Sequence, residues 1–253
     1  MALRDPRLPT EHFQKFVSEN DEFVAEDLAK LEAGREERSA YNLHAQIVDM
    51  SLETTLASYS MGEPLDQVQE RFCQAVDYLP ALHACRDTIP DYVRREEVSY
   101  YNQLRWLSFA ALFDLDERRR KLVLDEVAFF DNEKDPIIER MMIWLGGAEL
   151  ISGTTEIRWP DMAELWRAID GAPGSRDAHL WTYVRKWYAN NRDAYWHDRH
   201  KKKSVTGYFG YWCIEAAAVS VREGVDDSEC RDNEYYPTDL ADWARERRAA
   251  RTS

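Results

Sequence analysis

Helical periodicity runs through almost the whole chain and limits its fold more than any other feature. The clearest example is YNLHAQIVDMSLETTLASYS, residues 41–60. Its Leu43, Ile47 and Met50 recur at steps of three and four residues, which places them on one face of an α-helix. No segment shows the alternation of β-branched and polar residues that is typical of a half-buried strand. The sequence therefore predicts an all-α fold.

Similar apolar stripes, and the residues that punctuate them, predict the other helices. Asp135 and Ser175 are typical of helix starts, and Gly62 and Gly224 of helix ends. Pro80 is expected to kink or split its helix, because proline cannot donate the helical hydrogen bond. We expect about nine to ten helices in all. The further stripes cover residues 10–33, 65–88, 92–113, 116–130, 136–146, 161–170, 176–202, 207–223 and 238–249.

The chain is expected to form two packed helical halves with a boundary between residues 115 and 155, close to its least helical stretch. This stretch reads GGAELISGTTEIRW, residues 146–159, and a second break, PGS, follows at 173–175. We assign residues 1–125 to an N-terminal helical domain and 126–253 to a C-terminal one. No internal repeat at tetratricopeptide spacing is visible.

The charge of the chain is strongly negative. It has 47 acidic and 33 basic residues, which gives a formal net charge of −14. A negative field opposes binding to phosphates, so direct contact with nucleic acid is not expected. The same field speeds the encounter with a basic protein. The balance of charge thus favours a basic protein partner.

Export and membrane signals are absent from the sequence. The N-terminal MALRDPRLPTEHF has no apolar core of a signal peptide, and no run approaches 18 apolar residues. Cys73, Cys85, Cys213 and Cys230 form no CxxC pair and no zinc-ribbon spacing, so we expect them to stay reduced. These features predict a cytoplasmic protein without membrane contact.

One predicted helix carries a carboxylate in its apolar face. The segment YFGYWCIEAAAVSV, residues 208–221, places Glu215 on the same face as Tyr208 and Val219. A charged and unpaired carboxylate would cost roughly 3 kcal/mol or more there. We expect a buried ion pair or a tyrosine hydrogen bond. The alternative is a general base or a metal ligand with a raised pKa.

Acidic residues accumulate towards the C-terminus. Nine acids and two arginines lie between Glu215 and Trp243. A solvated loop explains such a run, and a docking surface for a basic partner is the functional alternative. The piece DDSECRDNE lacks the central glycine and the terminal acid of a calcium-binding EF-hand loop.

Motifs for catalysis are scarce. The chain has no GxSxG, GxxxxGK[ST] or GxGxxG sequence. In YWHDRHKKK, His197 and His200 could face a metal from one helix, and the dipeptide His197–Asp198 also occurs in helical metal phosphohydrolases. The three lysines are typical of a solvated helix end. We therefore assign no catalytic residue, no metal ligand and no cofactor.

Two ordered groups of residues resemble the immunity proteins of PoNe nuclease toxins, a bacterial family. The resemblance extends over about residues 10–245, nearly the whole chain. The N-terminal group is Tyr59-Ser60-x-Gly62 and LRWLSFAALFDLD, Leu104–Asp116. The C-terminal group is Gly210-Tyr211-Trp212, Glu215-Ala216-Ala217-Ala218, Asp226-Asp227 and Tyr235-Tyr236-Pro237-x-Asp239-Leu240.

This resemblance implies an inhibitor that performs no chemistry. It would bind a cognate DNase toxin of the PD-(D/E)xK class directly, and such toxins are often delivered by the type VI secretion system. The residues expected to build the scaffold are Gly210, Tyr211, Trp212, Glu215, Tyr236, Pro237 and Asp239. Those expected to contact the toxin as exposed acids are Asp226, Asp227, Glu229, Asp232 and Glu234. Equally available acids are Glu19, Asp21, Glu22, Glu26 and Asp27.

Two other functions stay open on the residues alone. One is a helical scaffold or adaptor protein unrelated to toxins. The other is a helical metal-dependent hydrolase that uses His197, Asp198 and distant acids. Self-association as a homodimer is left open as well.

Overall fold

Helices make up all the regular structure that is described for this chain. The computed structural model describes residues 2–34, 40–86, 97–129, 135–147, 157, 159–202 and 207–252. Every regular element within these ranges is a helix, so the all-α prediction is confirmed. None of the described helices is both long and apolar enough to cross a lipid bilayer. Most of the predicted break at 146–159 lies outside the described residues.

Two compact units divide the chain. Unit 1 comprises Met1–Pro90 and Ala194–Tyr211, and unit 2 comprises Asp91–Asp193 and Trp212–Ser253. Each unit therefore combines two stretches that are far apart in sequence. The predicted domains are two continuous stretches of sequence that meet at residue 125. The compact units are a different kind of division, so this boundary stays a prediction.

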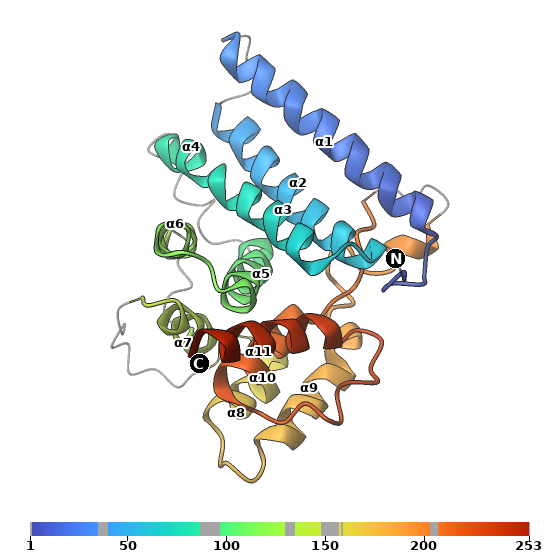
Figure 1. Cartoon of the computed structure of the whole chain (residues 1–253), viewed down its shortest axis with the longest axis vertical. Helices are drawn as coiled ribbons and strands as arrows, with labels where there is room; N and C mark the ends of the chain where they lie inside the picture. The colour runs from blue at the N-terminus through green and yellow to red at the C-terminus, as the bar shows by residue number, and fades with distance from the viewer. Residues whose placement is uncertain are drawn as a thin grey trace. The chain divides into compact units, whose positions relative to one another are not determined.

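Unit 1 is organised around its second helix. Its helices are α1 (Thr10–Glu32), α2 (Ala40–Met61), α3 (Leu65–Asp77) and α4 (Leu79–Ala84). Helix α2 packs against α1, α3 and α4, and Figure 1 shows α1 lying alongside it. Ile47, Leu52 and Leu56 of α2 are almost completely buried, as their helical spacing requires.

The ends of these helices follow the proline and glycine signals. Gly62 ends α2 with a φ of +91°, a conformation that favours glycine. A Cβ at this position would lie 2.1 Å from the backbone oxygen of Ala2, so the close approach of the N-terminal segment also requires glycine. Pro80 lies in the first turn of α4, directly after α3 has ended, which confirms the predicted split.

The helix predicted over residues 176–202 is shorter in the structure. Helix α9 (Arg176–Asn190) ends twelve residues before the predicted end at 202, and turns and a short 3₁₀ helix, η4 (Arg199–Lys201), follow it. The side chain of Asn191 donates to the backbone oxygen of Trp187 at 2.7 Å and binds a carbonyl at the helix end. The turns bring the ring of Trp196, which is buried, to 5.5 Å from that of Tyr211.

Residues 208–213 are not helical, although the pattern predicts a helix over 207–223. Helix α10 begins only at Ile214. Ser60 Oγ donates to the backbone oxygen of Phe209 at 2.8 Å, and Gly210 has a φ of +103°. These backbone groups bond to residues that are distant in sequence, so local periodicity could not predict their conformation.

Unit 2 surrounds helix α10. Its helices are α5 (Glu97–Phe113), α6 (Glu117–Ala128), α7 (Pro136–Trp144), η3 (Pro160–Met162), α8 (Ala163–Asp170), α9, α10 (Ile214–Glu223) and α11 (Thr238–Thr252). Helix α10 packs against α5, α8, α9 and α11 (Figure 1). Its Ala216, Ala217 and Ala218 are completely buried, and their small side chains let the neighbouring helices approach closely.

Capping residues fix several helix ends in unit 2. Asp135 accepts hydrogen bonds from the backbone amides of Ile137 at 3.0 Å and Ile138 at 3.3 Å, which confirms it as the start of α7. Helix α9 begins directly after Ser175, although the hydroxyl makes no capping bond. Gly224 ends α10 with a φ of +65°, as predicted.

Candidate functional site

The predicted C-terminal acids lie on the loop between α10 and α11. Four of them, Asp226, Glu229, Asp232 and Glu234, are exposed. Asp227 differs, because its side chain is only 7% exposed. The expectation that Asp227 is an exposed acid is therefore wrong.

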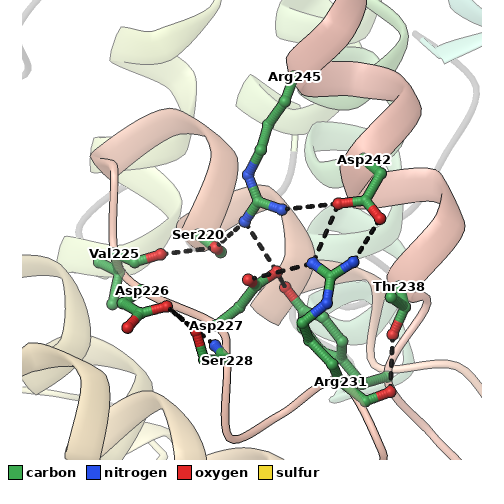
Figure 2. A network of polar contacts seen from close by, with 10 residues as sticks. Ser220, Val225, Asp226, Asp227, Ser228, Arg231, Thr238, Asp242 and Arg245 are labelled. Atoms are coloured by element: carbon green, nitrogen blue, oxygen red, sulfur yellow. Dashed lines mark hydrogen bonds and ion pairs between the residues drawn. The ribbon is translucent and has the colours of Figure 1, made fainter.

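Asp227 is the centre of a polar network (Figure 2). One carboxylate oxygen accepts hydrogen bonds from Arg245 Nη2 and from the hydroxyl of Tyr236, each at 2.7 Å. The other oxygen accepts from Arg231 Nη1 at 3.4 Å. Burial, followed by the charge and hydrogen bond of Asp227, raises the pKa of Tyr236. The carboxylate thus holds the loop together from inside.

The two arginines of this network connect the loop to both flanking helices. Arg231, on the loop, forms a two-pronged ion pair with Asp242 of α11, and Arg245 Nη1 lies 3.3 Å from the same carboxylate. Arg245 also donates to Ser220 Oγ of α10 at 2.5 Å. Hydrogen bonding from Arg231 lowers the pKa of Asp242. These contacts limit the mobility of the loop relative to the helices.

The exposed acids lie on this loop, which Arg231 and Arg245 connect to α10 and α11. Asp226 accepts hydrogen bonds from the backbone amide of Ser228 at 3.0 Å and from its hydroxyl at 2.5 Å, which closes a tight local turn. These bonds lower the pKa of Asp226 and keep it ionised. Glu229, Asp232 and Glu234 follow on the same loop. The arrangement is a rigid negative surface.

Glu215 is buried and hydrogen-bonded by neutral donors. Its Oε1 accepts from the hydroxyl of Tyr183 at 2.7 Å and from Trp187 Nε1 at 2.6 Å, and both donors lie on α9. Among the described residues no cation pairs with it, so of the two structural expectations the tyrosine hydrogen bond is confirmed. Burial and the charge of Glu215 raise the pKa of Tyr183 well above its ordinary value. The carboxylate connects α10 to α9.

The Gly-Tyr-Trp group is divided between the two units. Gly210 and Tyr211 end the second stretch of unit 1, and Trp212 begins that of unit 2. The hydroxyl of Tyr211 donates to the backbone oxygen of Trp196 at 3.2 Å. Its backbone amide donates to Asp5 Oδ2 at 3.4 Å.

Asp5 is a structural residue that no sequence pattern indicates. It is completely buried and accepts from the hydroxyl of Tyr208 at 2.5 Å, while Arg7 Nη1 lies 3.1 Å from its other oxygen. Burial, followed by the charge of Asp5, raises the pKa of Tyr208. Arg7 is a local partner, but Tyr208 and Tyr211 lie about two hundred positions along the chain, and no local pattern could indicate them.

The remaining motif residues lie directly before α11 and in its first turn. Tyr236 binds Asp227, and Pro237 is buried with its carbonyl accepting from the amide of Ala241 at 3.1 Å. Asp239 is exposed in the first turn, where a carboxylate is favoured by the helix dipole. A scaffold role for the whole motif stays a prediction.

The histidine pair makes local polar contacts. His197 Nδ1 lies 3.8 Å from Asp198, which in turn pairs with Lys201 at 2.8 Å. His200 Nδ1 lies 3.0 Å from the hydroxyl of Tyr211. Within the described ranges, no three or more histidine, cysteine or acidic residues are grouped so that they could hold a metal.

Helix α1 of unit 1 carries a second acidic surface. Its Glu19, Asp21, Glu22 and Glu26 are exposed, whereas Asp27 is buried and pairs with Lys30 at 2.6 Å. A groove of about 330 Å³ runs beside α1, with further walls from α2 and α3. The acids are evident in the sequence, whereas no sequence pattern indicates the groove.

Comparisons with known proteins identify relatives of both parts of the chain. The family model of the N-terminal domain of PoNe immunity proteins (PoNi) matches residues 4–124, and that of their C-terminal domain matches residues 133–240. The crystal structure of protein PA2201 from Pseudomonas aeruginosa has a similar fold, with a TM-score of 0.71 at 20% sequence identity. The likeness covers 97% of this chain and 92% of that one. No curated protein matches the sequence.

Proposed function

The chain belongs to the PoNe immunity protein family, and from this premise we propose that it binds one cognate DNase directly and keeps it inactive. Members of the family are immunity proteins against PoNe nuclease toxins and are not enzymes. The match of both family domains is the observation that carries the proposal. The partner is a nuclease of the PD-(D/E)xK class, delivered by a type VI secretion system, and the inhibitor acts in the cytoplasm.

Charge supports direct contact between the two proteins. An enzyme that cuts DNA needs cations along the path of its substrate, because phosphates must be neutralised there. This chain carries a net charge of −14 and would meet such a surface with the opposite sign. Long-range attraction then accelerates association, and the bound inhibitor competes with phosphate.

The C-terminal loop is a proposed contact surface. Asp226, Glu229, Asp232 and Glu234 would face the nuclease, while Asp227 supports the loop from inside. The rigidity of this loop favours tight binding, since little conformational entropy remains to be lost on association. Neither nucleic acid nor a membrane is needed for this mode of inhibition.

Co-purification with the nuclease encoded by the adjacent gene tests the proposal. We expect a stoichiometric complex, no cleavage of plasmid DNA by that complex, and survival of cells that produce both proteins. A purified inhibitor that neither binds this nuclease nor reduces its cleavage of DNA would show the proposal to be wrong.

A further inference from the structure

Helix α1 carries a half-exposed aromatic side chain on its surface. Phe23 is 51% exposed, and Tyr195, at 46%, is the other large apolar side chain exposed in the described ranges. Tyr195 donates its hydroxyl to Glu53 at 2.8 Å, whereas Phe23 has no polar group that favours solvent. The adjacent Val24 is buried. Exposure of a phenylalanine ring is unfavourable, so a partner that covers it would gain affinity.

Acidic side chains surround this ring. Glu19 and Glu26 lie four residues before and three residues after Phe23, on the same helix face, and Glu22 is adjacent. All three are exposed. Glu19 pairs with Lys15 at 3.6 Å and Glu22 accepts a hydrogen bond from Ser18 at 3.4 Å, but both contacts are exposed and each stabilises the helix only slightly. Like charges at helical spacing destabilise a helix, so α1 gains little stability from the acids as a group. An apolar centre with a charged surround is the composition of a protein-binding surface.

The groove borders the same turns of α1. Asp21, Val24 and Leu28 of α1 form one wall, and Arg71 of α3 and Tyr78, the residue after α3, form the other. Arg71 Nη1 pairs with Asp21 at 3.3 Å, so the charge of this arginine is already compensated within the groove. Its volume of about 330 Å³ is at the lower end of the range for ligand pockets and can take protruding side chains of a partner. Binding energy in protein interfaces concentrates on aromatic anchors and on the pockets that receive them, and the α1 surface offers one of each, the ring of Phe23 and the groove.

We propose that this α1 surface, defined by Glu19, Glu22, Phe23, Glu26 and the groove, docks the cognate nuclease. The proposal rests on the proposed function and adds a contact separate from the C-terminal loop. Charge decides the occupant. A second copy of this chain would bring like charges together, which is unfavourable, whereas a nuclease offers the cations of its DNA-binding surface.

Replacing the ring tests the apolar anchor. Phe23→Ala should weaken binding to the adjacent-gene nuclease about 30-fold, or about 2 kcal/mol, mainly through faster dissociation. Tyr195→Ala removes a similarly exposed aromatic from the same unit and should change binding less than about threefold. Surface plasmon resonance, with a nuclease made inactive by replacing one catalytic carboxylate, measures the affinity and the dissociation rate of both variants. Thermal midpoints close to that of the wild type for both variants would confirm that the inhibitor remains folded.

Reversing charge tests the acidic surround independently. Glu22→Lys with Glu26→Lys should slow association about tenfold at low salt and flatten its dependence on salt. The matched control, Asp170→Lys with Glu246→Lys, makes the same change of charge at exposed acids of unit 2. It should change the association rate less than about threefold, because only acids near the contact steer strongly.

The outcomes separate this inference from the proposed function. If the wild-type chain does not bind the nuclease, both are wrong. If it binds and both α1 variants behave like their controls, the α1 surface is refuted while the proposed function stands. A homodimer of the free chain that Phe23→Ala dissociates would also overturn the inference, since the surface would then belong to a second copy.

Discussion

Asp226 and Asp227 are neighbours with the same side chain but opposite environments, and they should respond very differently to mutation. Asp227 accepts hydrogen bonds from Arg245, Tyr236 and Arg231, and its side chain is 7% exposed. Asp226 is exposed and accepts only from Ser228 among the described residues. Replacing each by alanine therefore compares a buried support with a surface acid.

The loss of stability in Asp227→Ala depends on the arginine charges and the tyrosine hydroxyl that lose their acceptor. Removing one partner of a buried ion pair typically costs about 3–5 kcal/mol, because the remaining charge loses its compensation. Here Arg231 and Arg245 are each 35% exposed, and both keep Asp242 as a partner, so solvent and the second carboxylate reduce the loss. The hydroxyl of Tyr236 loses its acceptor as well. We expect a decrease of about 2–3 kcal/mol in the free energy of unfolding.

Thermal and urea unfolding of the purified variants measure this difference. For a chain of this length the midpoint should fall by about 5–10 °C in Asp227→Ala. Asp226→Ala removes only an exposed local turn and should lower the midpoint by less than about 2 °C. In nuclease binding the order should reverse, with Asp226→Ala reducing the association rate and Asp227→Ala retaining affinity per folded molecule. Equal midpoints for the two variants would refute the structural role of Asp227.

Three further predictions concern the same regions. Glu215→Gln should lower the free energy of unfolding by about 1–3 kcal/mol, because the groups around this side chain are hydrogen-bond donors and offer no acceptor to the new amide nitrogen. Nuclease affinity per folded molecule should stay unchanged. A stability equal to that of the wild type would contradict this prediction. The pKa of Asp242 is lowered from its ordinary value of 3.8, so its contribution to stability is present above that pH and is lost as the pH falls through the lower folded-state value. Asp242→Asn should therefore be less stable than wild type at pH 6 and lose less stability between pH 4 and 2 in urea unfolding, and parallel pH profiles would argue against the pairing. Asp226→Lys with Glu229→Lys should slow association with the nuclease and flatten its salt dependence, and an unchanged association rate would exclude the C-terminal loop as a steering surface.

Helix positions were largely predictable, because the signals that decide them are local. The stripe at 10–33 became α1, Thr10–Glu32, and that at 136–146 became α7, Pro136–Trp144. Capping by Asp135 is a contact between residues two and three positions apart, and the sequence displays it directly. The predictions that failed, beyond residue 190 and over 207–213, concern segments held by distant partners.

The candidate site was less predictable for the same reason. Family resemblance and charge pointed to the C-terminal acids, yet nothing in the sequence distinguishes Asp226 from Asp227. Likewise, Phe23 and Val24 are two adjacent apolar residues, and the stripe alone does not say which one faces the core.

By itself, the sequence determined the helical class, most helix boundaries, the negative charge and the family. Each of these depends on composition or on residues within one or two helical turns of each other. Only the tertiary structure decided which acids are internal supports, that Asp5 binds Tyr208, and that Phe23 stays in solvent. Burial and partnership depend on contacts between segments far apart along the chain, and no local pattern carries that information.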